Sequence, residues 1–335
     1  MIKEAKFWKR DGDKIRCLLC PHRCLIPEGK RGICRVRENR GGKLYTLIYG
    51  SASSVAVDPI EKKPLYHFYP GSYALSFGTA GCNLSCKHCQ NYTISMVDPE
   101  DIYLRELEVD EPTRLAKQYR CKGISWTYNE PTIWHEFTLD ASKIAKKDGL
   151  YITYVSNGFI NEDPFREIGR YLDGINIDVK SFRDDFYRKI SGGRLEPVLN
   201  TCVLSKELGI HLEITYLIIP TKNDSMKEIG EFCEWIIDEL GEDTPVHFTR
   251  FYPHYKMLDL SPTPFETLMK AFDLAKEKGL KFVYLGNVPH GDYENTYCPS
   301  CGNLLIERYG FNANIKGLEK DRCKKCGEKI NIVID

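Results

Sequence analysis

The fold is decided by a strand–helix–strand pattern in the middle of the chain: Tyr151-Ile152-Thr153-Tyr154-Val155-Ser156, then the helix-spaced segment Pro164–Leu172, then Gly174-Ile175-Asn176-Ile177-Asp178-Val179-Lys180. The two outer runs are short, bounded by turn residues and rich in residues that favour strands. Two strands joined through a helix at this spacing predict a parallel pair with a right-handed crossover.

The same alternation continues on both sides of this unit. The other predicted strands are Tyr73–Phe77, Gly123–Tyr128, Ile210–Ile219, Val246–Phe251 and Lys281–Leu285, and the other helix-spaced segments are Thr132–Lys147, Leu195–Leu208, Ser225–Leu240 and Pro264–Lys278. Such a chain forms either an open sheet covered on both faces or a full or partial barrel. Six or seven units are too few for an eightfold barrel. We therefore expect an α/β fold with a partial (β/α)6 TIM-like barrel.

Both arrangements place chemistry at the carboxyl ends of the strands. Polar side chains occur where several predicted strands end. They are Asn129 and Glu130 after the second strand, Asn157 after the third, Asp178 and Lys180 at the fourth, and Arg250 and His254 at and beyond the sixth, with His247 a weaker candidate. Each of these residues also has a purely structural interpretation. Glu130 could be an acidic residue at a helix N-terminus, Asn157 could form a strand-to-helix turn, and the histidines could be structural.

Composition narrows the function classes. The 335 residues are 42% hydrophobic and 28% charged, as in an ordinary globular protein, and the 47 basic and 47 acidic side chains cancel. A neutral chain gives no electrostatic reason to expect nucleic acid or an anionic membrane as a partner. The N-terminal segment carries charges where a signal peptide needs an apolar stretch, and no segment approaches 18 apolar residues. We expect a cytoplasmic protein.

The 14 cysteines are the unusual feature of the composition. In a reducing cytoplasm, metal ligands or catalytic thiols are the expected roles, and disulfides are the minor alternative. Eleven of the cysteines form three groups, and the other three, Cys121, Cys202 and Cys233, read as core residues. The grouping predicts an N-terminal module over 1–50, a barrel over 51–290 and a C-terminal module over 291–335.

The central group, Cys82, Cys86 and Cys89, has the spacing C-x3-C-x2-C directly after the first predicted strand. Three thiolates on one loop can ligate three irons of a cubane cluster and leave the fourth iron without a protein ligand, which makes it a site for chemistry. A zinc knuckle is the alternative, but it needs a fourth ligand such as His88.

This triad, with an aromatic residue before its last cysteine, resembles the signature of the radical S-adenosylmethionine (SAM) superfamily. The runs Cys89-Gln90-Asn91 and Thr127-Tyr128-Asn129-Glu130-Pro131 resemble the branch of pyruvate formate-lyase activating enzyme. The N-terminal cysteine motif, Phe251-Tyr252-Pro253-His254-Tyr255-Lys256-Met257 and the cysteine-rich tail are most similar to the radical SAM member of the AmmeMemoRadiSam system.

The resemblance implies a [4Fe-4S] cluster on Cys82, Cys86 and Cys89 whose open iron binds SAM. One electron would cleave SAM to methionine and a 5′-deoxyadenosyl radical, which abstracts hydrogen from a substrate. It also implies SAM or substrate contacts from the residues at the strand ends: Asn129, Glu130, Asn157, Asp178, Lys180, Arg250 and His254. The implied partners are a one-electron reductant such as ferredoxin or flavodoxin and, from the name of the system, Memo-like and AMMECR1-like proteins.

Two further metal sites are predicted from spacing. Cys298, Cys301, Cys323 and Cys326 form paired C-x2-C-G knuckles, typical of a zinc ribbon, with an auxiliary iron–sulfur cluster as the alternative. Cys17, Cys20, Cys24 and Cys34, with His22, could also close a four-coordinate site, for which zinc is the first choice and an auxiliary cluster the competitor.

These motifs do not specify the substrate. A radical enzyme acting on a small molecule or peptide is favoured over an activase that acts on a protein glycine. A different class of function is a non-catalytic iron–sulfur or zinc protein that serves electron transfer or nucleic acid. A cysteine triad that leaves one iron without a protein ligand argues against that class.

Overall fold

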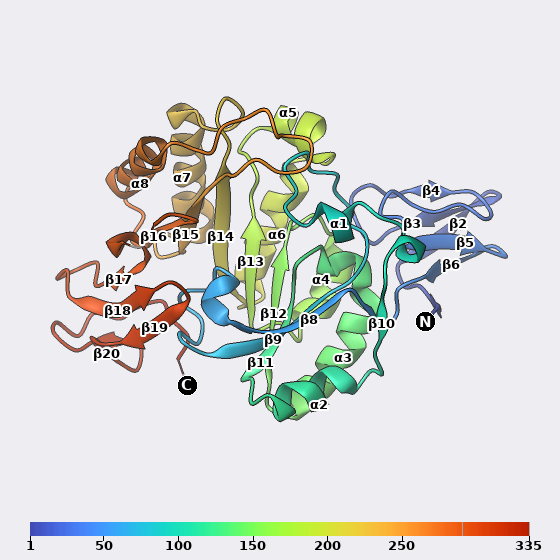
Figure 1. The fold of residues 1–335 in the computed structure, drawn as a ribbon, viewed down its shortest axis with the longest axis horizontal. Helices are drawn as coiled ribbons and strands as arrows, with labels where there is room; N and C mark the ends of the chain where they lie inside the picture. Colours follow the sequence, from blue (N-terminus) through green and yellow to red (C-terminus); the bar gives the residue numbers. More distant parts are fainter. Residues whose placement is uncertain (290, 335) are drawn as a thin grey trace.

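The computed structural model describes residues 1–289 and 291–334, and an eight-stranded sheet forms its centre (Figure 1). The strand order is β16-β15-β14-β13-β12-β11-β9-β8. The bounds are β8 (Ser54–Pro59), β9 (Tyr73–Gly78), β11 (Gly123–Trp126), β12 (Tyr151–Ser156), β13 (Gly174–Asp178), β14 (His211–Ile218), β15 (Val246–Arg250) and β16 (Val283–Gly286). Seven of these strands are parallel, and only β8 runs antiparallel to its neighbour β9.

Six crossovers connect the parallel strands, so the predicted α/β fold with a partial (β/α)6 barrel is confirmed. The edge strands β8 and β16 are not paired with each other within the described chain, which leaves the barrel incomplete. The crossover helices are α1 (Tyr92–Ser95), α2 (Glu111–Gln118), α3 (His135–Lys147), α4 (Glu162–Gly169), α5 (Asp184–Phe186), α6 (Glu196–Glu207), α7 (Met226–Leu240) and α8 (Phe265–Lys278). Short 3-10 or π segments lie at η1 (Ile60–Lys62), η2 (Pro99–Asp101), η3 (Pro131–Trp134), η4 (Tyr187–Ser191) and η5 (Asp292–Glu294).

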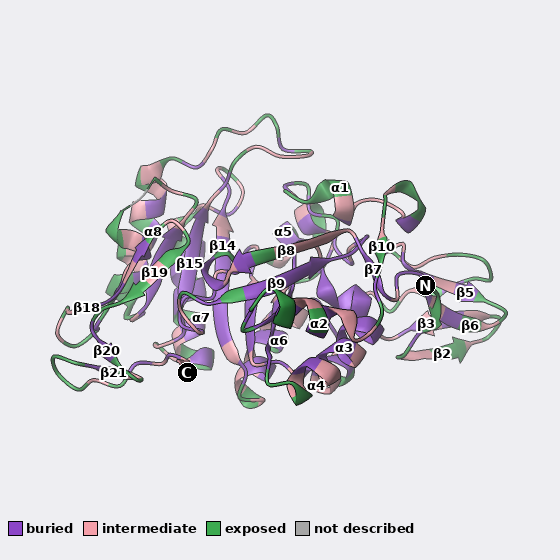
Figure 2. Cartoon of the chain, turned by 60° about the horizontal axis from the view of Figure 1, so that its bottom comes forward, coloured by how far each residue is buried: buried purple, intermediate pink, exposed green. Residues whose placement is uncertain are grey.

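The two faces of the sheet differ in chemistry. Phe77, Trp126 and Tyr154 are in register on β9, β11 and β12 and point toward the helices, where the Trp126 ring packs on Phe137 of α3. Ser76, Ser125 and Thr153 are in register on the opposite face. Because successive strand residues alternate between faces, an apolar core forms under the helices and a small, polar surface lines the inside of the barrel. Figure 2 shows the central strands as buried.

The amino ends of the strands are closed by the connection between β8 and β9. The Asn176 side chain donates to the Pro64 carbonyl at 2.8 Å, and Glu213 accepts the His67 amide at 2.6 Å. Phe68 lies against Gly174, where a Cβ would meet its ring at 3.2 Å. This segment, residues 60–69, packs against the lower part of the barrel, and we call it the plug.

The N-terminal segment forms two three-stranded sheets beside the barrel, at the right of Figure 1. One contains β2 (Trp8–Asp11), β3 (Lys14–Cys17) and β4 (Leu25–Ile26), and the other β1 (Lys3–Glu4), β6 (Lys43–Thr46) and β5 (Arg37–Arg40). A two-stranded sheet of β7 (Ser51–Ala52) and β10 (Arg105–Glu106) follows. Cys20, Cys34 and Val36 belong to the main hydrophobic core, so this segment is packed into the barrel wall.

The C-terminal segment lies at the opposite side, near the amino ends of the strands (Figure 1). Its strands are β17 (Thr296–Tyr297), β18 (Leu304–Tyr309), β19 (Asn312–Ile315), β20 (Leu318–Glu319) and β21 (Arg322–Cys323). Its core includes Phe282 and Tyr284 of the barrel and Tyr66 of the plug. No helix in the described part of the chain is long and apolar enough to cross a membrane.

Candidate active site at the barrel mouth

The cluster loop, residues 79–91, begins where β9 ends and carries the three central cysteines. All three are free, with Cys86 buried and Cys82 and Cys89 half-buried. The Leu84 amide donates to the Cys82 Sγ at 3.3 Å, and the Asn157 side-chain amide approaches the same sulfur at 3.7 Å. Such N–H donors stabilise a thiolate, which is the form that binds metal.

Asn129 holds the start of the cluster loop. Its Oδ1 accepts the Thr79 amide at 3.0 Å, and its Nδ2 donates to the Gly81 carbonyl at 2.8 Å. Tyr128, in a left-handed conformation with φ of 70°, turns its carbonyl toward Asn91, which donates to it at 2.5 Å. The end of β11 therefore clamps the loop on both sides of the cysteines. The sequence predicts a cofactor contact for Asn129, and in the structure both polar groups of its side chain bond to the backbone of the loop.

Glu130 lies at the same strand end, but its carboxylate is only 1% exposed. Oε1 accepts the Thr132 amide at 2.9 Å and the Ser156 hydroxyl at 2.8 Å, and Oε2 accepts the Asn157 amide at 2.8 Å. Burial raises its pKa, and these donors oppose the rise. Glu130 thus ties the end of β11 to the end of β12, so its predicted contact with SAM would have to be made by an already bonded carboxylate.

Asn157 connects this brace to the cluster loop. Its Nδ2 donates to the Asn83 Oδ1 at 2.9 Å, and its Oδ1 accepts the Phe159 amide at 2.9 Å. Asn83 in turn donates to the Phe159 carbonyl at 2.7 Å. The sequence placed Asn157 at the mouth, and the structure puts it against Cys82. Asn83 was missed because an asparagine between two ligands gives no signal of its own.

Asp178 and Lys180 form an ion pair of 3.1 Å at the end of β13. Burial lowers the pKa of Lys180, but the negative charge of Asp178, and of Cys86 when it is ionised, outweighs that effect and raises the pKa. In the other direction, burial raises the pKa of Cys86 to about 11 and Lys180 opposes the rise. A cation beside this thiol favours a bound anionic cluster.

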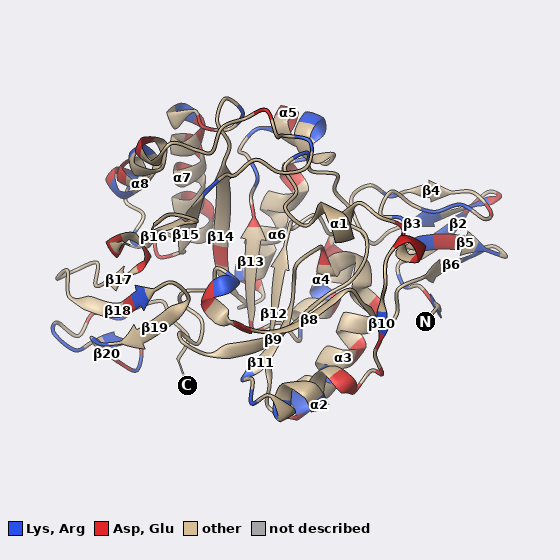
Figure 3. Ribbon diagram, viewed as in Figure 1, with Lys and Arg blue, Asp and Glu red and all other residues tan. Residues whose placement is uncertain are grey.

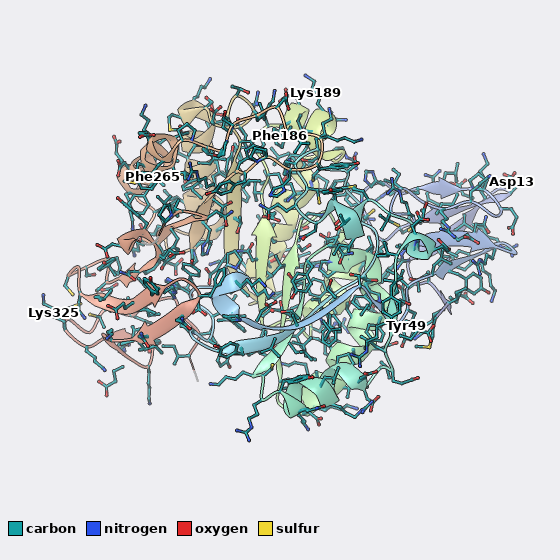
Figure 4. The ribbon with its side chains drawn as sticks, viewed as in Figure 1. Asp13, Tyr49, Phe186, Lys189, Phe265 and Lys325 are labelled. Atoms are coloured by element: carbon teal, nitrogen blue, oxygen red, sulfur yellow. The ribbon has the colours of Figure 1, made fainter. Side chains whose placement is uncertain are left out.

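His88 is buried inside the cluster loop and its Nδ1 has no hydrogen-bond partner in the described chain. Burial first, then the charge of Lys180, lowers its pKa to about 3. The ring lies 6.2 Å from Phe186, which Figure 4 labels near the top of the molecule, above the strand ends. The neutral ring therefore packs inside the loop beside Phe186.

The loop after β15, residues 251–263, reaches across the mouth to the cluster loop. The Lys256 amide donates to the Lys87 carbonyl at 3.0 Å, and the rings of Tyr255 and Tyr92 stack at 4.8 Å. His254 is half-buried in this loop. Arg250 donates to the Thr263 carbonyl at 2.7 Å, so its guanidinium supports the base of the loop. We call residues 251–263 the mouth loop.

His247 does not belong to the mouth. It lies near the amino end of β15, where its Nε2 is 2.6 Å from the Glu213 carboxylate and its ring stacks on Tyr284 at 5.2 Å. The alternation of side chains along a strand predicts which face a residue lies on, but it does not show whether the residue lies near the mouth or near the amino end. The sequence candidate is therefore a structural histidine beneath the barrel.

A family model described as the radical SAM superfamily matches residues 77–236, which include the cluster loop and the strand ends up to β14. The chain is also 50% identical over 336 residues to an uncharacterized protein of Methanocaldococcus jannaschii, covering 99% of this chain and 100% of that one. The chain belongs to the radical SAM superfamily. The resemblance predicted from the cysteine triad is confirmed.

Two further comparisons, one with a relative and one with a solved structure, are consistent with this family. The pyruvate formate-lyase-activating enzyme of Clostridium pasteurianum is 26% identical over 215 residues, 60% of this chain and 87% of that one. The crystal structure of a radical SAM methyltransferase from Sphaerobacter thermophilus has a TM-score of 0.51 at 16% identity, covering 65% of this chain and 67% of that one, which supports the fold. The radical SAM protein is therefore an enzyme whose relatives include activating enzymes.

The C-terminal cysteines form the tightest group of ligands. The sulfur atoms of Cys298 and Cys326 are 3.5 Å apart, those of Cys301 and Cys323 are 3.8 Å apart, and all four lie within 4.8 Å of one another. Zn–S bonds of about 2.3 Å in a tetrahedron place sulfurs roughly 3.8 Å apart, so this donor set fits one zinc ion. A yellow sulfur is visible beside the labelled Lys325 in Figure 4.

Proposed function

We propose that this enzyme cleaves SAM reductively at a [4Fe-4S] cluster held by Cys82, Cys86 and Cys89, and that it removes a hydrogen atom from a small molecule or peptide. When bound, the cluster supplies one electron to the sulfonium of SAM and releases methionine and a 5′-deoxyadenosyl radical. The proposal is supported by three free thiols on one loop, N–H donors on Cys82 and the Lys180 charge beside Cys86.

The chain's own residues have separate tasks in this scheme. Asn129 and Asn157 fix the loop and orient Cys82, and Glu130 keeps the ends of β11 and β12 together. Both charges of the Asp178–Lys180 pair act on the pKa of Cys86, and this pair is the best candidate to bind the polar part of SAM or of the substrate. His254 lies in the mouth loop, which Arg250 holds in place. It would contact SAM or the substrate from the side opposite the Asp178–Lys180 pair.

The preference for a small substrate depends on the mouth loop. The Lys256 amide binds it to Lys87 of the cluster loop, and the Tyr255 ring stacks on Tyr92 of α1, which follows that loop. Met257 is buried with Phe186, Ile219 and Phe251 in one apolar cluster, which anchors the crossing segment. A folded protein that presents a glycine would have to displace these contacts, whereas a metabolite or an extended peptide would not.

An activase is the second candidate, because relatives at 26% identity carry that name. Anaerobic reconstitution with SAM and dithionite decides the first step: 5′-deoxyadenosine should form, and the Cys86→Ala variant should form none. Release of deoxyadenosine by a metabolite or peptide fraction would support the proposal. A glycyl-radical signal on a protein partner, with no response to small molecules, would establish the activase.

The same proposal includes the surroundings of the enzyme. A low-potential carrier such as ferredoxin or flavodoxin would deliver the electron, and zinc would occupy the C-terminal cysteines. A cytoplasmic location suits thiols that must stay reduced. Memo-like and AMMECR1-like proteins are candidate partners, and co-purification followed by a deoxyadenosine assay with each added protein would test them.

A further inference from the structure

A second cysteine pocket lies between the N-terminal segment and the barrel. Cys17, Cys20, Cys24 and Cys34 line it together with His22, Arg37 and apolar side chains, among them Ile133 of η3. Three of the thiols are buried and Cys24 is half-buried. The four cysteines therefore line one pocket, which approaches the surface on the side of Cys24 and Ile33.

The spacing of these sulfurs separates two kinds of metal site. Across the described chain, only the C-terminal cysteines form a group of three or more potential ligands whose donor atoms all lie within 4.8 Å of one another. The N-terminal four share a pocket but are spread more widely, as are the three cysteines of the cluster loop. One zinc ion draws its sulfurs to roughly 3.8 Å, whereas a cubane places each thiolate on a different iron and holds them farther apart.

Arg37 supplies an independent sign of a ligand. Its side chain is 1% exposed and lines the pocket, while its terminal nitrogen donates to both oxygens of Glu136 at 2.6 Å. The Nε has no hydrogen-bond partner in the described chain. A buried N–H donor is costly to leave unpaired, and sulfide or thiolate sulfur of an anionic cluster would accept it.

The pocket touches the cluster loop directly. The His22 Nε2 is 2.7 Å from the Asn83 carbonyl, and the His22 ring packs on Phe159 at 4.9 Å. A Cβ on Gly81 would meet the Cys34 carbonyl oxygen at 2.6 Å, so these two backbones are in contact. His22 lies between Cys20 and Cys24, and Asn83 follows Cys82, so one hydrogen bond connects the two ligand sets.

We propose that Cys17, Cys20, Cys24 and Cys34 hold an auxiliary [4Fe-4S] cluster that passes electrons across the His22–Asn83 contact to the catalytic cluster. This inference rests on the proposed function for its acceptor. One electron enters from an external low-potential carrier, which is oxidised. The auxiliary cluster is reduced and reoxidised in turn, and the electron leaves on the sulfonium of SAM, so no charge accumulates.

The outer side of the pocket is suited to an acidic carrier. Residues 1–50 contain 13 basic and five acidic side chains, a net charge of +8 in a chain whose total is zero. Acidic residues outside the segment pair with four of these cations, Lys3, Lys6, Arg31 and Arg37, and the segment remains basic after these pairs are counted. Figure 3 shows Lys and Arg along the β2–β3 hairpin and β5. Arg23 and Arg35 adjoin Cys24 and Cys34, and no acidic residue of the described chain pairs with either. Ile33, 55% exposed, adds an apolar contact. Opposite charge steers association of such partners.

Metal content tests the site. After anaerobic reconstitution the intact protein should carry about eight irons, eight sulfides and one zinc per chain. The double variant Cys20→Ala/Cys34→Ala should carry about four irons, keep the zinc and keep the change in electron paramagnetic resonance that SAM induces. Cys86→Ala should also carry about four irons but lose that change.

These variants separate the two proposals. About four irons with two zinc ions in the intact protein, or unchanged iron in the N-terminal double variant, would refute the auxiliary cluster. An unaltered SAM response in Cys86→Ala would instead refute the catalytic assignment. If circular dichroism shows that Cys20→Ala/Cys34→Ala does not fold, Cys17→Ala/Cys24→Ala makes the same comparison on the opposite ligands.

The electron path has its own test. In His22→Ala, both clusters should form, and stopped-flow reduction of the catalytic cluster by reduced flavodoxin should slow about tenfold, equivalent to a barrier about 1.4 kcal/mol higher. Dithionite, which can enter elsewhere, should reduce the variant and the intact protein at the same rate. Equal rates with flavodoxin would exclude His22 as the route.

Discussion

The two outer cysteine modules use four thiols each, yet their geometry and positions differ. The C-terminal four gather within 4.8 Å of one another on a module at the amino ends of the strands, away from the mouth. The N-terminal four line a wider pocket that touches the cluster loop. Under the two proposals above, the narrow sulfur spacing suits one zinc ion and the wider spacing suits a cluster, and only the N-terminal site contacts the cluster loop.

The largest expected effect comes from breaking the C-terminal site. If zinc binds there as proposed, Cys323→Ser should remove it and unfold the module around Leu305 and Ile306, at a cost of several kcal/mol, since binding of a structural metal is linked to folding. Iron content and SAM binding should change little. Zinc analysis, thermal unfolding and limited proteolysis measure this. Loss of the SAM response in folded Cys323→Ser would show that the modules are not separate in function.

The contact between the N-terminal module and the cluster loop can be broken at Gly81. Its φ is 88°, and an added Cβ would meet Cys34 O at 2.6 Å, so Gly81→Ala should cost about 3 kcal/mol and weaken SAM binding. Gly29→Ala is the matched control: φ is 65° and no atom lies within 4 Å, so only the backbone cost of about 1 kcal/mol remains. Urea unfolding and SAM titration compare them, and equal losses in both would contradict the collision.

Acid should weaken the joint between the plug and the C-terminal module. His67 lies between the Asn331 carbonyl and the Tyr284 hydroxyl, and burial lowers its pKa to about 3. The unfolded chain then binds more protons, so stability is lost as pH falls from about 6.5 toward 3, by about 2 kcal/mol at pH 5. His67→Gln should flatten this part of the urea-derived stability profile. If the slope of stability against pH is the same in the variant, groups other than His67 cause the loss of stability in acid.

The smallest effect is expected at the clamp on the cluster loop. Asn129→Ala removes the bonds to Thr79 and Gly81, which should weaken SAM binding by about 1–2 kcal/mol while the fold persists. Asn303→Ala is the counterpart in the C-terminal module, because Asn303 approaches Cys323 Sγ at 3.7 Å, and it should leave SAM binding unchanged. Equal SAM affinity in both variants would contradict a positioning role for Asn129.

Local patterns in the sequence determined the barrel and the ligand groups. Strand β12 was predicted with its observed bounds, Tyr151–Ser156, and α7 and α8 within one residue at their starts, because burial periodicity and turn residues are carried by chain neighbours. The three cysteine groups were evident for the same reason. Helix α2 was not predicted, and neither was β8, which is antiparallel and lies outside the strand–helix alternation that carried the prediction.

The tertiary structure alone decided what these residues do. His22 meets Asn83 across 61 positions, the mouth loop crosses from β15 to the loop after β9, and Asn129 and Glu130 use their polar atoms on backbone and neighbouring strands. Sulfur spacing, too, depends on how distant turns pack against the barrel. A sequence pattern specifies which atoms can bind, but distances between remote segments arise only when the common core brings them together.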